Sequence, residues 1–172
     1  MNENNLAMKA YHLAYRYEAE IGSCPQCVLS AVKETLGIID EHTIQASDAL
    51  AGGTALSSQG TCGALVGGLM AISSVVGRTY SDFTDGKRKR RVFSYAQKLY
   101  HRFVKEYGSP LCCNVQKQLF GRSFVLSDKD EYQAFEEAGA HVDKCPSVSG
   151  NVAQWTIEIL IHDLKLMNTI KK

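Results

Sequence analysis

The segment Gly22–Val32 reads GSCPQCVLSAV and holds two cysteines, Cys24 and Cys27, in the Cys-x-x-Cys spacing of redox motifs. Thioredoxin-like proteins carry this spacing next to a βαβ pattern. Here no segment that alternates apolar and polar residues precedes the motif. Pro25 suits the first position of a helix, and Gly37 suits the position just after its end. The stretch therefore predicts the start of a helix and argues against a thioredoxin-like fold.

Apolar residues at helical spacing fill most of the remaining chain, and only a short piece at 124–126 reads as extended. We therefore expect an all-α fold, a compact bundle of about seven helices with little or no strand. The 172 residues suit one domain, 1–172. The main expected helices cover residues 6–21, 25–36, 61–76, 85–107 and 109–120, and the last helix begins at Cys145.

The charge balance argues against nucleic acid as a partner, because 19 basic residues face 18 acidic ones. The basic run Lys87–Arg91 has no interleaved aromatic residues, so we expect it to be the solvated entry of the helix over 85–107. The longest apolar run, Gly63–Gly77, is too short to cross a bilayer. The N-terminus lacks the layout of a signal peptide. We expect a soluble cytoplasmic protein without a membrane partner.

The chain has six cysteines, and four of them fall at expected helix starts. Cysteines in a reducing compartment are typical of metal-binding or catalytic sites rather than of a disulfide framework. At a helix start, unpaired N–H groups and the positive end of the helix dipole favour the thiolate, which is both the nucleophile and the metal ligand. These four residues are Cys24, Cys62, Cys112 and Cys145.

The other two cysteines are placed differently. Cys27 lies one turn beyond Cys24 on the same helical face, so this pair is able to close a disulfide or to chelate an ion. Cys113 directly follows Cys112, and neighbouring residues in a helix point about 100° apart. Only one of these two thiols can therefore face a common site.

Four sequence blocks resemble the C_GCAxxG_C_C family, a group of redox-active proteins named for its cysteine pattern. The resemblance extends over about residues 20–162 and implies an all-helical fold with redox activity, without defining a reaction. It assigns the cysteines of the family pattern to the four helix-start positions. The blocks are SCPQCVLSAV, GTCGALVGGLMA, LCCNVQKQLFGRSF and HVDKCPSVSGNVAQW, with pattern cysteines at Cys24, Cys62, Cys112 and Cys145.

The chain departs from the family pattern in two ways. The pattern reads Gly-Cys-Ala where this chain has Thr61-Cys62-Gly63, although Gly67 still falls at the expected glycine. Cys27 and Cys113 are additions to the pattern. They leave open whether the site contains four cysteines or more.

Glycines and histidines near these cysteines are further candidates. Gly63 and Gly67 share one helix face, which suits either the close approach of a cofactor or the close packing of another helix. His101, His141 and His162 are candidates to complete a metal site or to act as bases. Of these, His141 lies four residues before Cys145.

Three functions fit these residues. The first is thiol–disulfide or electron-transfer chemistry, with Cys24 and Cys62 as a reactive pair, Cys112 and Cys145 as partners, and Cys27 as a further catalytic candidate. Its partner would be a redox protein or a small thiol or disulfide. In the second, the four helix-start cysteines bind zinc or an iron–sulfur cluster. The third is a non-enzymatic helical interaction module without a cofactor. Whether the chain is an oxidoreductase and how it oligomerises stay open.

Overall fold

The computed structural model describes residues 2–164, with side chains to residue 161, and this part of the chain is all-α, as the sequence predicts. Within it the α-helices number nine rather than about seven, joined by a 3₁₀ turn (Asp48–Leu50) and a π-helical turn (Ala140–Lys144). Among the described residues, strand-type pairing is limited to one isolated bridge, Thr61 with Leu111. The helices are α1 (Glu3–Glu20), α2 (Cys24–Leu36), α3 (Glu41–Ala46), α4 (Gly63–Val76), α5 (Tyr80–Thr84), α6 (Arg91–Tyr107), α7 (Cys112–Phe120), α8 (Lys129–Glu137) and α9 (Cys145–Leu164).

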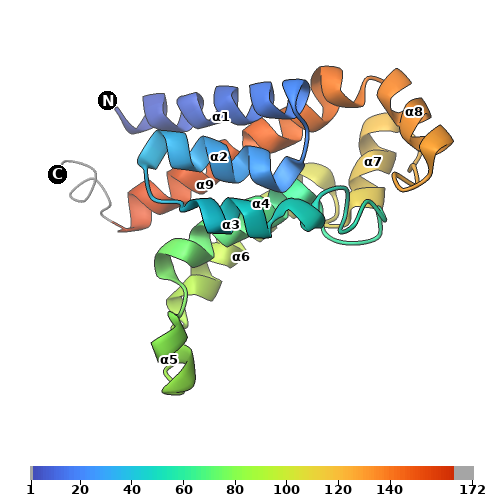
Figure 1. Cartoon of the computed structure of the whole chain (residues 1–172). Helices are drawn as coiled ribbons and strands as arrows, with labels where there is room; N and C mark the ends of the chain where they lie inside the picture. The colour runs from blue at the N-terminus through green and yellow to red at the C-terminus, as the bar shows by residue number, and fades with distance from the viewer. Residues whose placement is uncertain (1, 165–172) are drawn as a thin grey trace.

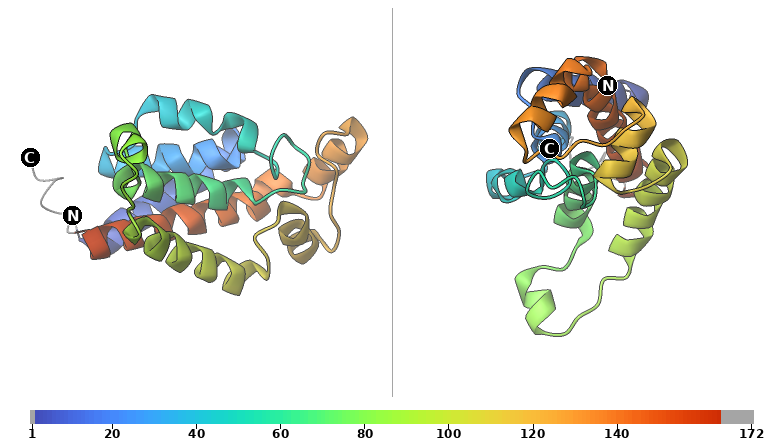
Figure 2. Two further views of the ribbon diagram at one scale, coloured as in Figure 1. Left: turned by 90° about the horizontal axis from the view of Figure 1, so that it is seen from below. Right: turned by 90° about the vertical axis from the view of Figure 1, so that its right-hand side faces the viewer.

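Helix α9 runs through the centre of the bundle, and α1, α2, α4 and α6 pack around it (Figure 1, Figure 2). A helix that is apolar on most sides is stable only where other helices cover it. Accordingly, Val152, Ile157 and Leu160 of α9 are completely buried. None of the helices in the described range is both long enough and apolar enough to span a membrane.

Helices α2 and α4 approach closely because glycines face α2 from α4. A Cβ atom at Gly67 would lie 2.6 Å from the carbonyl oxygen of Pro25. A Cβ atom at Gly63 would lie 2.9 Å from Cδ of Pro25 and 3.2 Å from Cβ of Cys24. This contact holds the start of α2 against the start of α4, so that Cys24 lies near Cys62.

The expectation of a single helix over 85–107 is wrong. The separate helix α5 and a loop precede α6, and together they form an arm that projects from the bundle (Figure 1). Thr79 and Asp82 form a capping box, which starts α5 at Tyr80, five residues before the expected helix. The basic run 87–91 is exposed on the arm, as expected, and Lys89 pairs with Asp82 at 2.7 Å.

A second, smaller hydrophobic cluster joins α7, α8 and the π-helical turn at one end of the bundle. Its buried members are Phe124, Leu126, Phe135 and Ala140. The ring of Phe135 lies 5.3 Å from that of Phe120, centroid to centroid. Because these aromatic rings lie at the end where α2, α4 and α9 begin, they form the far wall of the cavity between those helix starts.

Replacing Gly67 with alanine is expected to destabilise the fold by about 1–3 kcal/mol, because the new methyl group overlaps the backbone of Pro25. Alanine forms helices better than glycine, so without a clash the substitution would stabilise the protein. A lower free energy of unfolding would therefore report the packing clash. Urea unfolding measures it, with the exposed Ser73→Ala in the same helix as the control. A Gly67→Ala protein as stable as the control would contradict the close contact.

Candidate functional site

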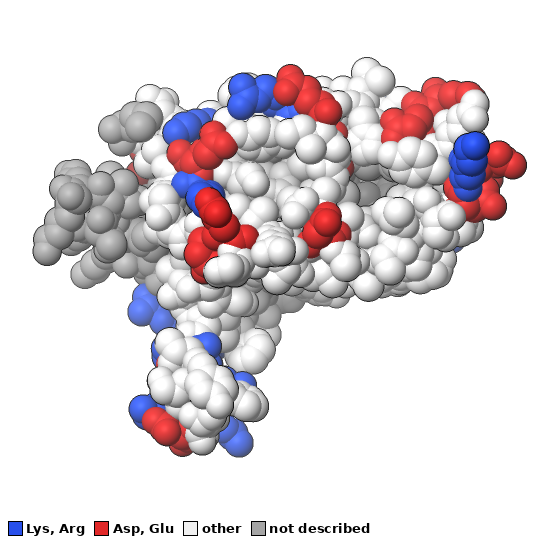
Figure 3. Space-filling view, in the orientation of Figure 1, with Lys and Arg blue, Asp and Glu red and all other residues white. Residues whose placement is uncertain are grey.

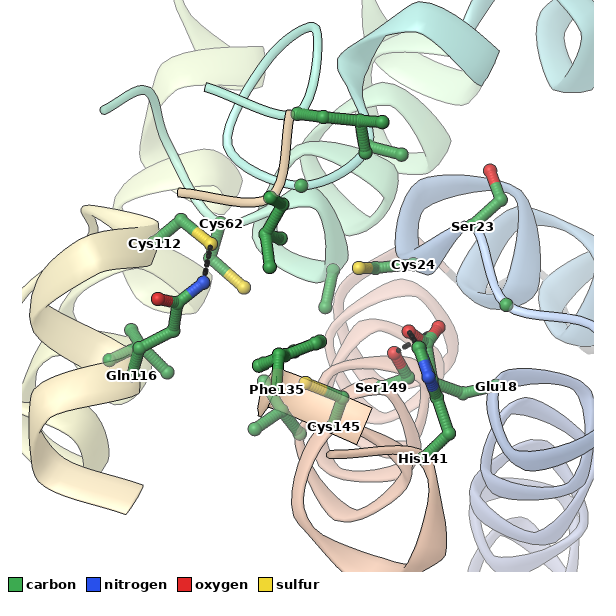
Figure 4. Close-up of a pocket in the computed structure, with 18 of the residues that line it drawn as sticks. Glu18, Ser23, Cys24, Cys62, Cys112, Gln116, Phe135, His141, Cys145 and Ser149 are labelled. Atoms are coloured by element: carbon green, nitrogen blue, oxygen red, sulfur yellow. Dashed lines mark hydrogen bonds and ion pairs between the residues drawn. The ribbon is translucent and has the colours of Figure 1, made fainter. Parts of the chain in front are cut away.

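Four cysteines line one cavity of about 320 Å³ between the helix starts. Their side chains come from four different helices and point into the same space (Figure 4). All of the cysteines are free thiols. Cys24 is the first residue of α2, Cys62 is the N-cap of α4, Cys112 is the first residue of α7, and Cys145 is the first residue of α9.

A short backbone pairing joins the segments that carry Cys62 and Cys112, which lie diagonally across it. The N–H of Cys62 donates to the carbonyl oxygen of Pro110 at 2.8 Å, and the N–H of Cys112 donates to that of Gly60 at 2.9 Å. These two bonds flank the Thr61–Leu111 bridge. Segments that are far apart in the sequence are therefore joined at the two cysteines.

The loop before Cys62 has an unusual backbone. Five consecutive residues, 52–56, have φ values between 51° and 70°, and three of them (Thr54, Ala55 and Leu56) are not glycine. Left-handed backbone costs about 1–2 kcal/mol for each such residue and rarely occurs in runs. Strain of this kind is concentrated at functional sites. After this turn, the carbonyl oxygen of Ser58 accepts a hydrogen bond from the N–H of Cys113 at 2.8 Å.

Gln116 fixes the thiol of Cys112. Its Nε2 donates to Sγ of Cys112 at 3.5 Å and to Oγ of Ser58 at 3.3 Å, while its Oε1 accepts from the N–H of Phe124 at 2.7 Å. This buried amide therefore links the cavity to the aromatic cluster. It also gives a structural reason for the VQ and FGRSF elements of the third sequence block.

The start of α9 differs from the other three. The N–H of Cys145 donates to the carbonyl oxygen of Ala140 in the π-helical turn, so Cys145 does not lie at a free helix end. Single π-helical turns are frequent at functional sites. This turn directs His141 to the cavity (Figure 4).

The two additional cysteines lie outside the cavity lining. The buried thiol of Cys27 donates to the carbonyl oxygen of Gly22 at 2.9 Å. The thiol of Cys113 contacts the side chain of Asn114 at 3.8 Å. Cys27 therefore does not share a wall of the cavity with Cys24.

Gly63 and Gly67 are likewise absent from the cavity lining, and the contacts they make are those of helix packing against Pro25. Of the candidate histidines, only His141 lines the cavity. His101 is exposed on α6, and the side chain of His162 lies outside the described residues.

Burial, rather than the helix dipole, controls the charge state of the thiols. Burial raises the pKa of Cys62 to about 11, although the backbone N–H groups of Ala64 and Leu65 pull it down. Burial and the neighbouring Cys62 raise the pKa of Cys112 to about 12. The pKa values of Cys24 and Cys145 are also raised, by burial first and then by Glu18. The expectation that the helix starts hold these thiols charged at neutral pH is therefore wrong, because it neglected desolvation.

The motifs gave no reason to expect the buried Glu18, which lines the cavity and is 1% exposed. Oγ of Ser149 donates to its Oε2 at 3.1 Å, and its Oε1 has no hydrogen-bond partner. The available signal was the spacing of Ala10, Ala14 and Glu18, which places this carboxylate on the buried stripe of α1.

The geometry does not fit a single metal ion. Within the part of the chain that the structure describes, no group of three or more His, Cys, Asp and Glu side chains is close enough together to hold one. The four thiols surround the cavity rather than meeting at a point (Figure 4). Binding one ion would require the helix starts to move together.

These features define an all-α thiol protein with four of its six cysteines lining one cavity. A family model described as "Putative redox-active protein (C_GCAxxG_C_C)" matches residues 22–159. The chain therefore belongs to the C_GCAxxG_C_C family. No curated protein and no solved structure gives a significant match.

Raising the pH above about 8.5 is expected to destabilise the fold. Cysteine in an unfolded chain titrates near about 8.5, below the pKa values of Cys62 and Cys112 in the folded protein. The unfolded state therefore loses its protons first, and the free energy of unfolding falls by up to about 1.4 kcal/mol per pH unit for each thiol between the two pKa values. At neutral pH the contribution is constant.

Urea unfolding from neutral pH to about pH 10.5 measures this slope. The double variant Cys62→Ser/Cys112→Ser is the matched control and should show a flatter pH dependence. Equal slopes in the two proteins would contradict the raised pKa values.

Proposed function

We propose that this protein performs thiol–disulfide exchange, with Cys62 and Cys112 as the pair that cycles between two thiols and one disulfide. The observation that carries the proposal is the backbone pairing that holds these two cysteines diagonally across the Thr61–Leu111 bridge, with both of them lining the cavity. Membership of a redox-active family supports it. The pairing favours Cys112 over Cys24 as the partner of Cys62.

The exchange balances as follows for a substrate disulfide R–S–S–R′. Cys112, which is more exposed than Cys62, loses its proton and attacks one sulfur; a mixed disulfide forms and R′–S⁻ leaves. Cys62 then loses its proton and attacks the Cys112 sulfur, which releases R–S⁻. The two leaving thiolates take up the two protons. The protein is oxidised by two electrons, and the substrate is reduced to R–SH and R′–SH.

Gln116 is the positioning residue of this pair. Its amide donates to the Cys112 sulfur, which lowers the pKa of that thiol against the effect of burial. The same amide is held at its other end by the backbone of Phe124. We assign Cys24 and Cys145, which also line the cavity, to a second thiol pair that exchanges with the first.

A second candidate is the binding of an iron–sulfur cluster or zinc. The observation that favours it is the convergence of four thiols, whose anionic forms repel one another and would be stabilised by a cation. Against a single ion stands the separation of the donors among the described residues. We therefore derive no reaction step through a metal.

Oxidation of the purified, reduced protein by a small disulfide is expected to produce a Cys62–Cys112 disulfide, read by peptide mapping and mass spectrometry. The variant Cys62→Ser should stop at a mixed disulfide on Cys112, because the resolving thiol is missing. The variant Cys112→Ser lacks the attacking thiol and should form the mixed disulfide much more slowly. Cys113→Ser is the matched control, because this neighbour lies outside the cavity lining, and it should behave as the wild type.

Two results would contradict the proposal. One is a reduced protein that reacts with no disulfide, and the other is a Cys62→Ser/Cys112→Ser variant that exchanges as fast as the wild type. Iron or zinc bound in stoichiometric amounts after anaerobic purification, with the four thiols blocked to alkylation, would favour the second candidate.

A further inference from the structure

The charged residues that line the cavity are of one sign. Glu18, Glu20 and Glu136 contribute carboxylates, whereas none of its lining residues, all of which are described, is lysine or arginine. His141 is the remaining titratable group apart from the thiols and Tyr132. A cleft with carboxylates on apolar walls concentrates cations and repels anions.

Glu18 is the deepest of these carboxylates, and one of its oxygens is left without a partner. Its Oε1 accepts no hydrogen bond, although it lies 3.7 Å from Nε2 of His141. Nδ1 of His141 is 2.6 Å from the carboxylate of Glu136. The separation of 3.7 Å between Nε2 and Oε1 is too long for a hydrogen bond.

A buried carboxylate oxygen without a partner is costly and calls for an explanation. Glu18 is one of the residues that line the cavity, where its side chain is drawn together with Ser149, His141 and the thiols (Figure 4). A cationic group that enters the cavity would satisfy the unpartnered oxygen by a charge-assisted hydrogen bond. A ligand that reaches this carboxylate can supply the hydrogen-bond donor that Oε1 lacks.

The end of the molecule that carries α8 is also acidic, although Glu131 there is paired with Arg122. Acidic side chains gather at the α8 end of the molecule (Figure 3), where α8 carries Asp130, Glu131, Glu136 and Glu137 against one lysine, Lys129. Exposed apolar side chains of the lining, Ile21 and Leu56, lie at the surface beside it. This end of the molecule thus combines negative charge with exposed apolar side chains.

We propose that the substrate of the exchange reaction is a small disulfide that carries an amino group or another cation, which Glu18 binds while the disulfide reaches the cavity thiols. This inference rests on the proposed thiol–disulfide exchange and names its substrate class. A cavity of about 320 Å³ suits a small molecule. The exchange itself is the balanced two-thiol reaction given above.

Binding of such a cation also supplies the activation that the resting site lacks. The charge of Glu18 raises the pKa values of Cys24, Cys27 and Cys145. As the smallest of the causes, it also raises those of the proposed pair, Cys62 and Cys112. A bound ammonium group would offset that charge and favour the thiolates. The thiols would then become reactive when a cationic substrate is present and stay protonated otherwise.

Three disulfides of similar size test the inference: cystamine, which is dicationic, bis(2-hydroxyethyl) disulfide, which is neutral, and dithiodiglycolate, which is dianionic. The rate of each with the reduced protein is divided by its rate with dithiothreitol in the same buffer, which removes differences in intrinsic reactivity. The wild type is expected to prefer cystamine to the neutral compound by about tenfold, the lower end of electrostatic focusing, and to react slowest with the dianion.

The variant Glu18→Gln keeps the size of the side chain and an acceptor for Ser149, and it should abolish the preference. Glu137→Gln removes a charge from the same end of the molecule but outside the cavity lining, and it should retain the preference. Should Glu18→Gln fail to fold, Glu136→Gln at the half-buried edge of the cavity serves instead and should reduce the preference.

The outcomes separate the two proposals. Similar normalised rates for all three disulfides, or a preference unchanged in Glu18→Gln, would overturn the inference and leave thiol–disulfide exchange intact. No reaction with any of the three would overturn the exchange function itself.

Discussion

Two backbone hydrogen bonds, between Cys62 and Pro110 and between Cys112 and Gly60, hold the site together. They join the start of α4 to the start of α7, which otherwise belong to different parts of the fold. The left-handed turn over 52–56 prepares this junction at a cost in backbone strain. Because the junction is made by main-chain atoms, it fixes the positions of the two cysteines irrespective of whether their thiols are reduced or oxidised.

Burial gives the cavity its chemical character. The helix starts supply N–H groups that favour thiolates, but removal from water raises the thiol pKa values more strongly. Glu18 adds a second anionic group to the same space. Both effects favour protonated thiols in the resting site. The cationic substrate that we propose would offset the second of them.

The all-α fold and the starts of α2, α4 and α7 could be predicted from the sequence, because proline and glycine mark helix ends locally. The arm could not be predicted in this way. The regular apolar spacing of α6 favours one long helix, and the Thr79 capping box before it is a weaker signal in the sequence. The role of Glu18 and the thiol pKa values depend on which residues close over the cavity. That information lies in contacts between distant segments, such as Gln116 with Phe124, and no local pattern encodes it.

The central claim is that the fold brings Cys62 and Cys112 together as a redox pair in a shared thiol cavity. A crystal structure of the protein after mild oxidation tests this directly. The account predicts continuous density between the Sγ atoms of Cys62 and Cys112, with the backbone pairing to Pro110 and Gly60 preserved. Density that instead joins either cysteine to Cys27 or Cys113, or four cysteines placed in separate parts of the molecule, would contradict it.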